Sequence, residues 1–172
     1  AETADTGHIP CILYNVPGRT GCSIPVSVVE RLSKHPNIVG IKEASGDMSY
    51  AMKIARCVGP DFALYSGNDD ITVPLMSIGG SGVISVYANV MPAMCHQIVD
   101  DYLHGRQAQA VANHLKYLQL MNDLFLEVNP IPVKTAMNLL GLNVGPMRLP
   151  LCEMSAEHAA ALRTTMEEAG LL

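Results

Sequence analysis

Tryptophan is absent from the 172-residue sequence, which has only two phenylalanines and six tyrosines. The hydrophobic residues, 49% of the chain, are therefore mostly aliphatic or methionine. An aliphatic core is typical of parallel strands buried beneath helices. Positive charge is also scarce: the chain has 11 lysines and arginines against 16 aspartates and glutamates, which gives a net charge of −5. Nucleic acids and anionic membranes bind basic patches, so we expect neither as a partner.

The cysteines and histidines form no pattern of a disulfide framework or a metal site. The five cysteines are scattered without a C-x-x-C pair, and the six histidines include no H-E-x-x-H motif. We therefore expect no metal, no cofactor and a reducing, cytoplasmic location. The chain starts at Ala1, with neither a signal peptide nor an initiator methionine, which predicts a fragment or a processed form.

One uncharged stretch, residues 71–95, is long enough to span a membrane. It contains two prolines and three glycines between positions 74 and 92. A lipid-exposed helix does not tolerate that density of helix breakers without neighbouring segments to satisfy its backbone. We predict a helix, a turn and a buried strand here instead.

Short apolar runs alternate with helical patterns in the first part of the chain. Ser23 and Asp47 are the expected caps of the first two helices, and further helices are expected from about Asp70 and Met91. Strands that alternate with helices predict βα units with parallel strands. The predicted strands are 11–14, 38–42, 62–66 and 82–86.

The alternation stops after Gly105, and only helical patterns follow. Ser155 is the expected cap of the last of these helices. The predicted domains are 1–105, with the strands, and 106–172, with helices over 106–128, 133–140 and 155–169.

Four βα units fit either a small open sheet or half of a closed (β/α)8 barrel, which needs eight units. Both architectures place the functional site at the carboxyl ends of the strands. The predicted strands end in or near polar or small residues, among them Asn15, Glu43, Ser66 and Ser85. We therefore expect a functional site at this edge of the sheet.

Lys42 is the first candidate for a catalytic residue. It ends the apolar run from Ile38 to Ile41, and lysine is rare at buried positions unless it is paired or functional. Burial favours the neutral amine, which is the form that attacks a carbonyl to make a Schiff base. The alternative is a structural lysine whose amine reaches solvent or pairs with Glu43, and for an isolated lysine this is the commoner case.

Tyr14 and Arg19 follow the preceding strand. A phenol at the end of a strand can relay protons, although a core tyrosine with a satisfied hydroxyl is more common. The forked guanidinium of an arginine matches a carboxylate, although a solvated loop arginine is the usual case. Pro17, Gly18 and Gly21 predict a tight loop around Arg19.

Taken together, several runs resemble the dihydrodipicolinate synthase family over nearly the whole chain. The most specific are Y-N-V-P-G-R-T-G at 14–21 and G-I-K-E-A-S-G at 40–46. Others are S-G-N-D at 66–69, G-V-I-S-V at 82–86 and N-P-I-P-V-K at 129–134.

The resemblance implies an α/β fold, the second half of a TIM (β/α)8 barrel followed by an all-helical C-terminal domain. It implies a class I lyase in which Lys42 forms a Schiff base with pyruvate, Tyr14 relays protons and Arg19 holds the carboxylate of aspartate semialdehyde. Ile84, through its backbone carbonyl, and Gly67 are the further substrate-binding residues. The product, 4-hydroxy-tetrahydrodipicolinate, serves diaminopimelate and lysine biosynthesis. The expected assembly is a homo-oligomer, the family's tetramer.

Relatives within the family leave alternatives open. N-acetylneuraminate lyase and keto-deoxy sugar-acid aldolases share the lysine and the tyrosine, but they usually lack the arginine at the position of Arg19. The family's barrel has eight units, and this chain begins just before the fifth strand. An inactive truncated chain, or one that associates with the missing half, is therefore the other alternative. We expect the chain alone not to be a stable, active monomer.

Overall fold

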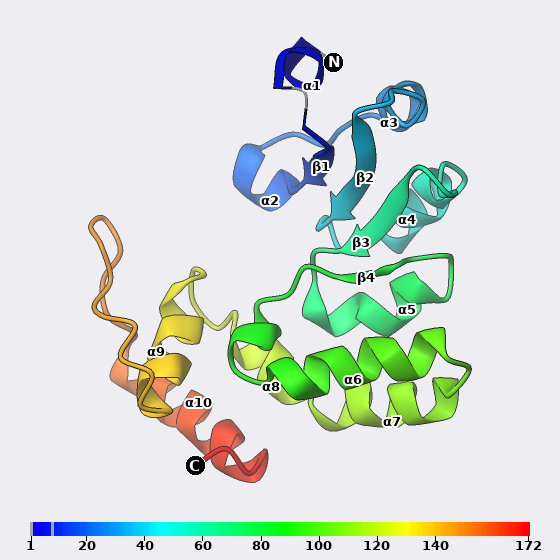
Figure 1. The fold of residues 1–172 in the computed structure, drawn as a ribbon. Helices are drawn as coiled ribbons and strands as arrows, with labels where there is room; N and C mark the ends of the chain where they lie inside the picture. The colour runs from blue at the N-terminus through cyan, green and yellow to red at the C-terminus, as the bar shows by residue number, and fades with distance from the viewer. Residues whose placement is uncertain (1, 8) are drawn as a thin grey trace. The chain divides into compact units, whose positions relative to one another are not determined.

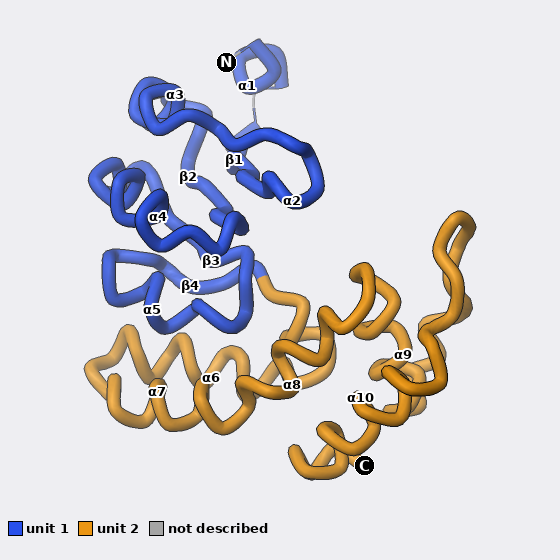
Figure 2. The backbone as a smooth tube through the Cα atoms, turned by 180° about the vertical axis from the view of Figure 1, so that it is seen from behind, with its two compact units in different colours: residues 1–84 blue, residues 85–172 orange. Residues whose placement is uncertain are grey.

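The computed structural model describes residues 2–7 and 9–172, and the chain divides into two compact units, Ala1–Ile84 and Ser85–Leu172 (Figure 2). We call these unit 1 and unit 2. The sheet belongs entirely to unit 1, whereas the regular elements among the described residues of unit 2 are all helices, joined by loops. The domain boundary predicted at Gly105 stays a prediction.

Unit 1 contains a parallel sheet with strand order β1-β2-β3-β4, so neighbours along the chain are neighbours in the sheet (Figure 1). This confirms the strand–helix alternation predicted from the sequence. The elements of unit 1 are α1 (Glu2–Gly7), β1 (Cys11–Asn15), α2 (Pro17–Thr20), α3 (Val26–Leu32), β2 (Ile38–Glu43), α4 (Met48–Ala55), β3 (Ala63–Ser66), the 3₁₀ helix η1 (Asp69–Ile71), α5 (Thr72–Met76) and β4 (Gly82–Val83).

The two faces of this sheet differ sharply in burial. Ile41 and Leu64, paired in register on β2 and β3, are fully buried together with Val29 of α3 and Ile54 of α4. Complete burial of an aliphatic side chain stabilises the fold by about 1.5–3 kcal/mol. Tyr14 on β1 projects from the opposite face of the sheet and is 47% exposed. One face is therefore the core of unit 1, and the other face carries more exposed side chains.

Two predictions for unit 1 were wrong in detail. Ser23 is not a helix cap, because α3 begins only after Pro25, and a separate short helix, α2, occupies the expected loop. The fourth strand ends at Val83 rather than Val86, since the chain turns away from β3 after Ile84 donates its N–H to the carbonyl of Ser66. The cap at Asp47 is confirmed, because its carboxylate accepts hydrogen bonds from the first turn of α4.

Unit 2 consists of packed helices. Helices α6 and α7 pack against each other, and α10 packs against α8 and α9. Thr165 of α10 donates a hydrogen bond of 2.5 Å to the buried carboxylate of Asp123 on α8. The elements are the 3₁₀ helix η2 (Tyr87–Asn89), α6 (Pro92–Leu103), α7 (Gln107–Lys116), α8 (Leu118–Asp123), α9 (Ile131–Leu139) and α10 (Ala156–Glu168).

The single helix predicted over residues 106–128 is two helices in the structure. The chain leaves helical geometry at Tyr117, with φ −103° and ψ 9°, and α8 follows directly. The Tyr117 ring is buried there, 6.3 Å from the ring of Tyr87. Apolar spacing alone does not reveal such a break, because both helices keep the same pattern across it. The cap at Ser155 is confirmed by its hydrogen bond from the N–H of His158.

The uncharged stretch 71–95 is divided among several short elements. It runs through α5, β4 and η2 before entering α6. Across residues 2–7 and 9–172, no helix has both the length and the apolar character needed to cross a bilayer.

Candidate active site

The strand register places two predicted site residues and one further tyrosine in a row across the sheet. Tyr14 on β1 pairs with Lys42 on β2, and Lys42 pairs with Tyr65 on β3. Residues paired in register on parallel strands project from the same face of the sheet. This row lies near the carboxyl ends of the strands, on the face opposite the core, where the sequence predicted a site.

The Lys42 amine lies over the Tyr14 ring, with Nζ 4.3 Å from the ring centroid. Such contact is a cation–π geometry when the amine is protonated, and it places the amine beside a phenol. Lys42 is half-buried and Tyr14 is 47% exposed. The two residues expected to act together are therefore in contact.

Gly67 leaves the space through which the Lys42 side chain passes. A Cβ atom at this position would lie 3.0 Å from Cε of Lys42 and 2.6 Å from Cβ of Ala44. The backbone N–H of Gly67 also donates a 2.6 Å hydrogen bond to the carbonyl of Glu43. Any larger residue here would displace Lys42 or the chain that follows it.

Glu43 does not pair with Lys42, because adjacent residues of a strand point to opposite faces. Its carboxylate is 1% exposed on the core face. One carboxylate oxygen accepts from the side-chain amide of Asn15 at 2.7 Å, and the other accepts from the backbone N–H of Ser45 at 2.6 Å. The ion pair considered from the sequence is therefore not formed.

Asn15 connects this carboxylate to the loop after β1, and Tyr50 binds the same loop. The side-chain amide oxygen of Asn15 accepts from the N–H of Ile24 at 2.9 Å, and the Tyr50 hydroxyl donates to the carbonyl of Ile24 at 2.7 Å. Burial raises the pKa of Tyr50 to about 12, and the negative charge of Glu43 adds to the shift. Tyr50 therefore remains a neutral hydrogen-bond donor at physiological pH.

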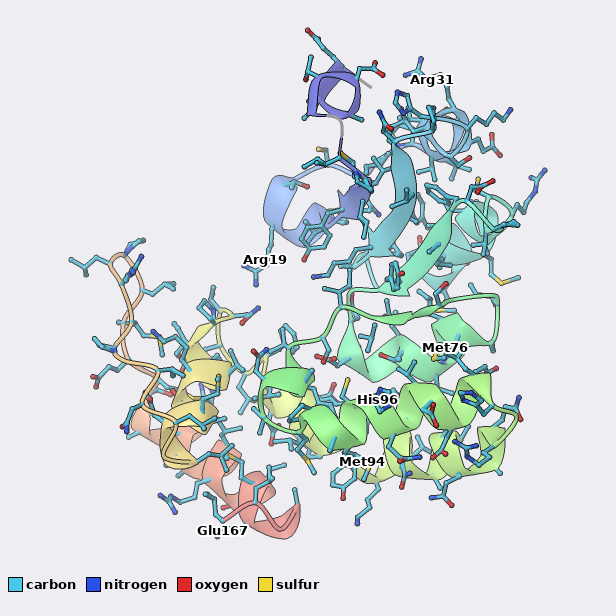
Figure 3. The ribbon with its side chains drawn as sticks, viewed as in Figure 1. Arg19, Arg31, Met76, Met94, His96 and Glu167 are labelled. Atoms are coloured by element: carbon cyan, nitrogen blue, oxygen red, sulfur yellow. The ribbon has the colours of Figure 1, made fainter. Side chains whose placement is uncertain are left out.

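Arg19 lies within the same loop, on the short helix α2. Figure 3 shows its side chain extending away from α2, and the residue is exposed. Gly21 ends this helix with φ 72°, a conformation that favours glycine, and its N–H donates to the carbonyl of Pro17. The structure thus places Arg19 on a separate element from Lys42 and Tyr14, next to β1 in the chain.

Ile84 is bound through its backbone to the end of the neighbouring strand. Its N–H donates to the carbonyl of Ser66 at 2.9 Å, and its side chain is 40% exposed. Ser66 directly precedes Gly67, so Ile84 is anchored one residue from the glycine that accommodates Lys42.

The sequence reasoning missed the roles of Asn15, Glu43 and Tyr50. The sequence indicates a polar strand end at Asn15, and a polar strand end or a partner of Lys42 at Glu43, although each directly follows a candidate catalytic residue. Their shared position at the ends of adjacent strands was the available signal, since parallel register places such residues side by side. Tyr50 gave no comparable signal, because its position on α4 resembles that of an ordinary core residue.

Known proteins resemble nearly the whole chain. The model of the dihydrodipicolinate synthetase family matches residues 2–169. A 4-hydroxy-tetrahydrodipicolinate synthase of Clostridium perfringens is 49% identical over 168 residues, which are 98% of this chain and 58% of the relative. The chain thus spans 58% of the length of this curated relative.

Solved structures match the fold closely as well. The dihydrodipicolinate synthase of Cyanidioschyzon merolae with lysine bound has a TM-score of 0.94 and 41% identity, with 99% of this chain and 58% of that chain covered. The chloride-inhibited synthase of Acinetobacter baumannii in complex with pyruvate has a TM-score of 0.95 and 37% identity, with 99% and 59% covered.

Proposed function

Because the chain belongs to the dihydrodipicolinate synthetase family, we propose that it carries the Schiff-base lysine of a 4-hydroxy-tetrahydrodipicolinate synthase. The parallel sheet of unit 1 is then the second half of a TIM barrel. The observation that carries the proposal is the contact between the Lys42 amine and the Tyr14 ring, at the strand ends and beside Gly67. The activity belongs to a complete barrel, since this chain spans 58% of a relative's length.

In the proposed reaction, the neutral amine of Lys42 attacks the ketone carbon of pyruvate. The resulting carbinolamine must lose water to form a protonated imine, and Tyr14 is placed to move protons in this step. Loss of a proton from the pyruvate methyl group gives an enamine, whose carbon attacks the aldehyde of aspartate semialdehyde. The aldehyde oxygen takes up a proton as the carbon–carbon bond forms.

The remaining residues bind the substrates in this proposal. Arg19 offers paired N–H donors to the semialdehyde carboxylate from α2. The Ile84 carbonyl and the backbone at Gly67 bind the pyruvate-derived part in this proposal, from the residues that directly follow β4 and β3. The homo-oligomer expected from the family resemblance belongs to the same proposal.

The test is borohydride trapping in a complete-barrel protein, meaning one in which this chain follows the preceding segment of the barrel. Pyruvate and borohydride should add a reduced pyruvyl group to Lys42, which peptide mass spectrometry locates. Lys53 and Lys134 serve as internal controls and should stay unmodified. Labelling of either control with Lys42 unmodified would overturn the proposal, and so would a preference for N-acetylneuraminate or a keto-deoxy sugar acid as substrate.

A further inference from the structure

We propose that Asn15, Glu43 and Tyr50 form a positioning network that holds the loop bearing Arg19, and thereby sets the affinity for aspartate semialdehyde without touching it. This inference rests on the proposed function, because the network affects substrate binding only if Arg19 binds aspartate semialdehyde. We call the three residues the strand-end network.

The starting observation is a buried carboxylate with only neutral partners. Glu43 is 1% exposed, and its two oxygens accept from the amide of Asn15 and the N–H of Ser45. Removing a carboxylate from water is costly, and hydrogen bonds from neutral groups compensate only part of that cost. An apolar residue would serve the core at least as well, so the carboxylate calls for a reason other than stability.

The chemistry of the carboxylate fixes the orientation of Asn15. A carboxylate only accepts hydrogen bonds, so the Asn15 amide must turn its NH₂ group toward Glu43. The amide oxygen then faces away from Glu43 and accepts from the N–H of Ile24 at 2.9 Å. The network therefore selects one orientation of Asn15, and that orientation holds the backbone of Ile24.

Ile24 is held from both sides of its backbone. Its N–H is bound by Asn15 and its carbonyl by the Tyr50 hydroxyl at 2.7 Å. The loop that bears Arg19 leaves β1 directly after Asn15 and is tied down again at Ile24. Both ends of the loop are thus fixed by the same asparagine, while Arg19 between them is exposed.

Fixing a loop in this way affects the substrate that the loop binds. Misplacement of a binding group by about 1 Å can cost about a hundredfold in rate. Lys42 and Tyr14, by contrast, are held by the register of the sheet itself. Disturbing Asn15 or Tyr50 should therefore impair semialdehyde use more than Schiff-base formation with pyruvate.

The test compares Asn15→Asp and Tyr50→Phe with the unmodified complete-barrel protein. Asn15→Asp places a second carboxylate against Glu43, and Tyr50→Phe removes the donor to the Ile24 carbonyl. In each variant, kcat/KM for aspartate semialdehyde should fall at least about tenfold. The rate of pyruvate trapping on Lys42 should change less than about threefold. Asn37→Asp and Tyr102→Phe make the same chemical changes away from the network and should leave both quantities unchanged.

Testing Tyr50→Phe in a second variant distinguishes a positioning effect on Arg19 from a general loss of structure. In an Arg19→Ala background, Tyr50→Phe should cause little further loss of semialdehyde use, because the network acts through Arg19. A full additional loss in that background would overturn the inference, as would unchanged kcat/KM in both single variants. If the unmodified protein fails to trap pyruvate on Lys42, the proposed function itself is wrong, so the two failures are distinguishable. Should Asn15→Asp not fold, Tyr50→Phe alone decides the outcome.

Discussion

The Lys42 amine sits 4.3 Å from the centroid of the Tyr14 ring, and the two residues are paired in register on adjacent strands. A sheet register is a rigid way to hold two reactive groups together, because it is fixed by backbone hydrogen bonds along both strands. Neither residue depends on a flexible loop for its place.

This contact predicts the effect of Tyr14→Phe. The ring remains beneath the amine, but the hydroxyl that we propose moves protons is lost. Proton transfer by a positioned side chain contributes about 10²–10⁴-fold to a rate, so kcat in a complete-barrel protein should fall within that range. Steady-state kinetics measures it, and circular dichroism checks that the fold is kept. A loss smaller than about fivefold would contradict the relay role.

Gly67→Ala should damage both the site and the fold. The new Cβ would lie 2.6 Å from Cβ of Ala44 and 3.0 Å from Cε of Lys42, so one of them must move. Overpacking of this kind costs about 1–3 kcal/mol of the free energy of unfolding, and trapping of pyruvate on Lys42 should slow in parallel. Urea unfolding and borohydride trapping measure the two effects. Gly59→Ala is the matched control, because a Cβ there meets nothing within 4 Å.

Arg19→Ala should reduce the use of aspartate semialdehyde far more than pyruvate trapping. Loss of a bidentate contact to a carboxylate should cost about 2–4 kcal/mol in transition-state binding. The measurement is kcat/KM for the semialdehyde at saturating pyruvate. A decrease of less than about threefold would mean that Arg19 does not hold this substrate.

Acid should destabilise unit 2 through Glu127. Hydrogen bonds from the backbone of Ser155 and from the His158 ring hold the pKa of Glu127 below its usual value. A carboxyl whose pKa is lower in the folded state stabilises the fold above its unfolded pKa of about 4.3, and this contribution is lost as the pH falls through the folded pKa.

Glu127→Gln should therefore lower the free energy of unfolding near neutral pH and make it less dependent on pH in the acidic range. Urea unfolding between neutral and acidic pH gives both quantities, with the exposed Glu168→Gln as the control. Identical pH profiles for Glu127→Gln and the unmodified chain would refute this contribution.

Local patterns in the sequence determined much of the fold. Short apolar runs fixed where the strands lie, and the side chains of Asp47 and Ser155 cap the helices that were predicted from them. These features depend on residues within a few positions of one another, so they can be predicted from the sequence. The placement of Lys42 at a strand end is of the same kind.

Tertiary structure alone decided the partners of these residues. Asn15 and Glu43 are 28 positions apart, and only the pairing of β1 with β2 brings the amide to the carboxylate. The helix break at Tyr117 likewise coincides with the burial of its ring beside Tyr87, a residue in a distant segment. The spacing of residues in the sequence indicates which face of a helix or strand a side chain lies on. The strand register and the packing between distant segments determine which residues that side chain contacts.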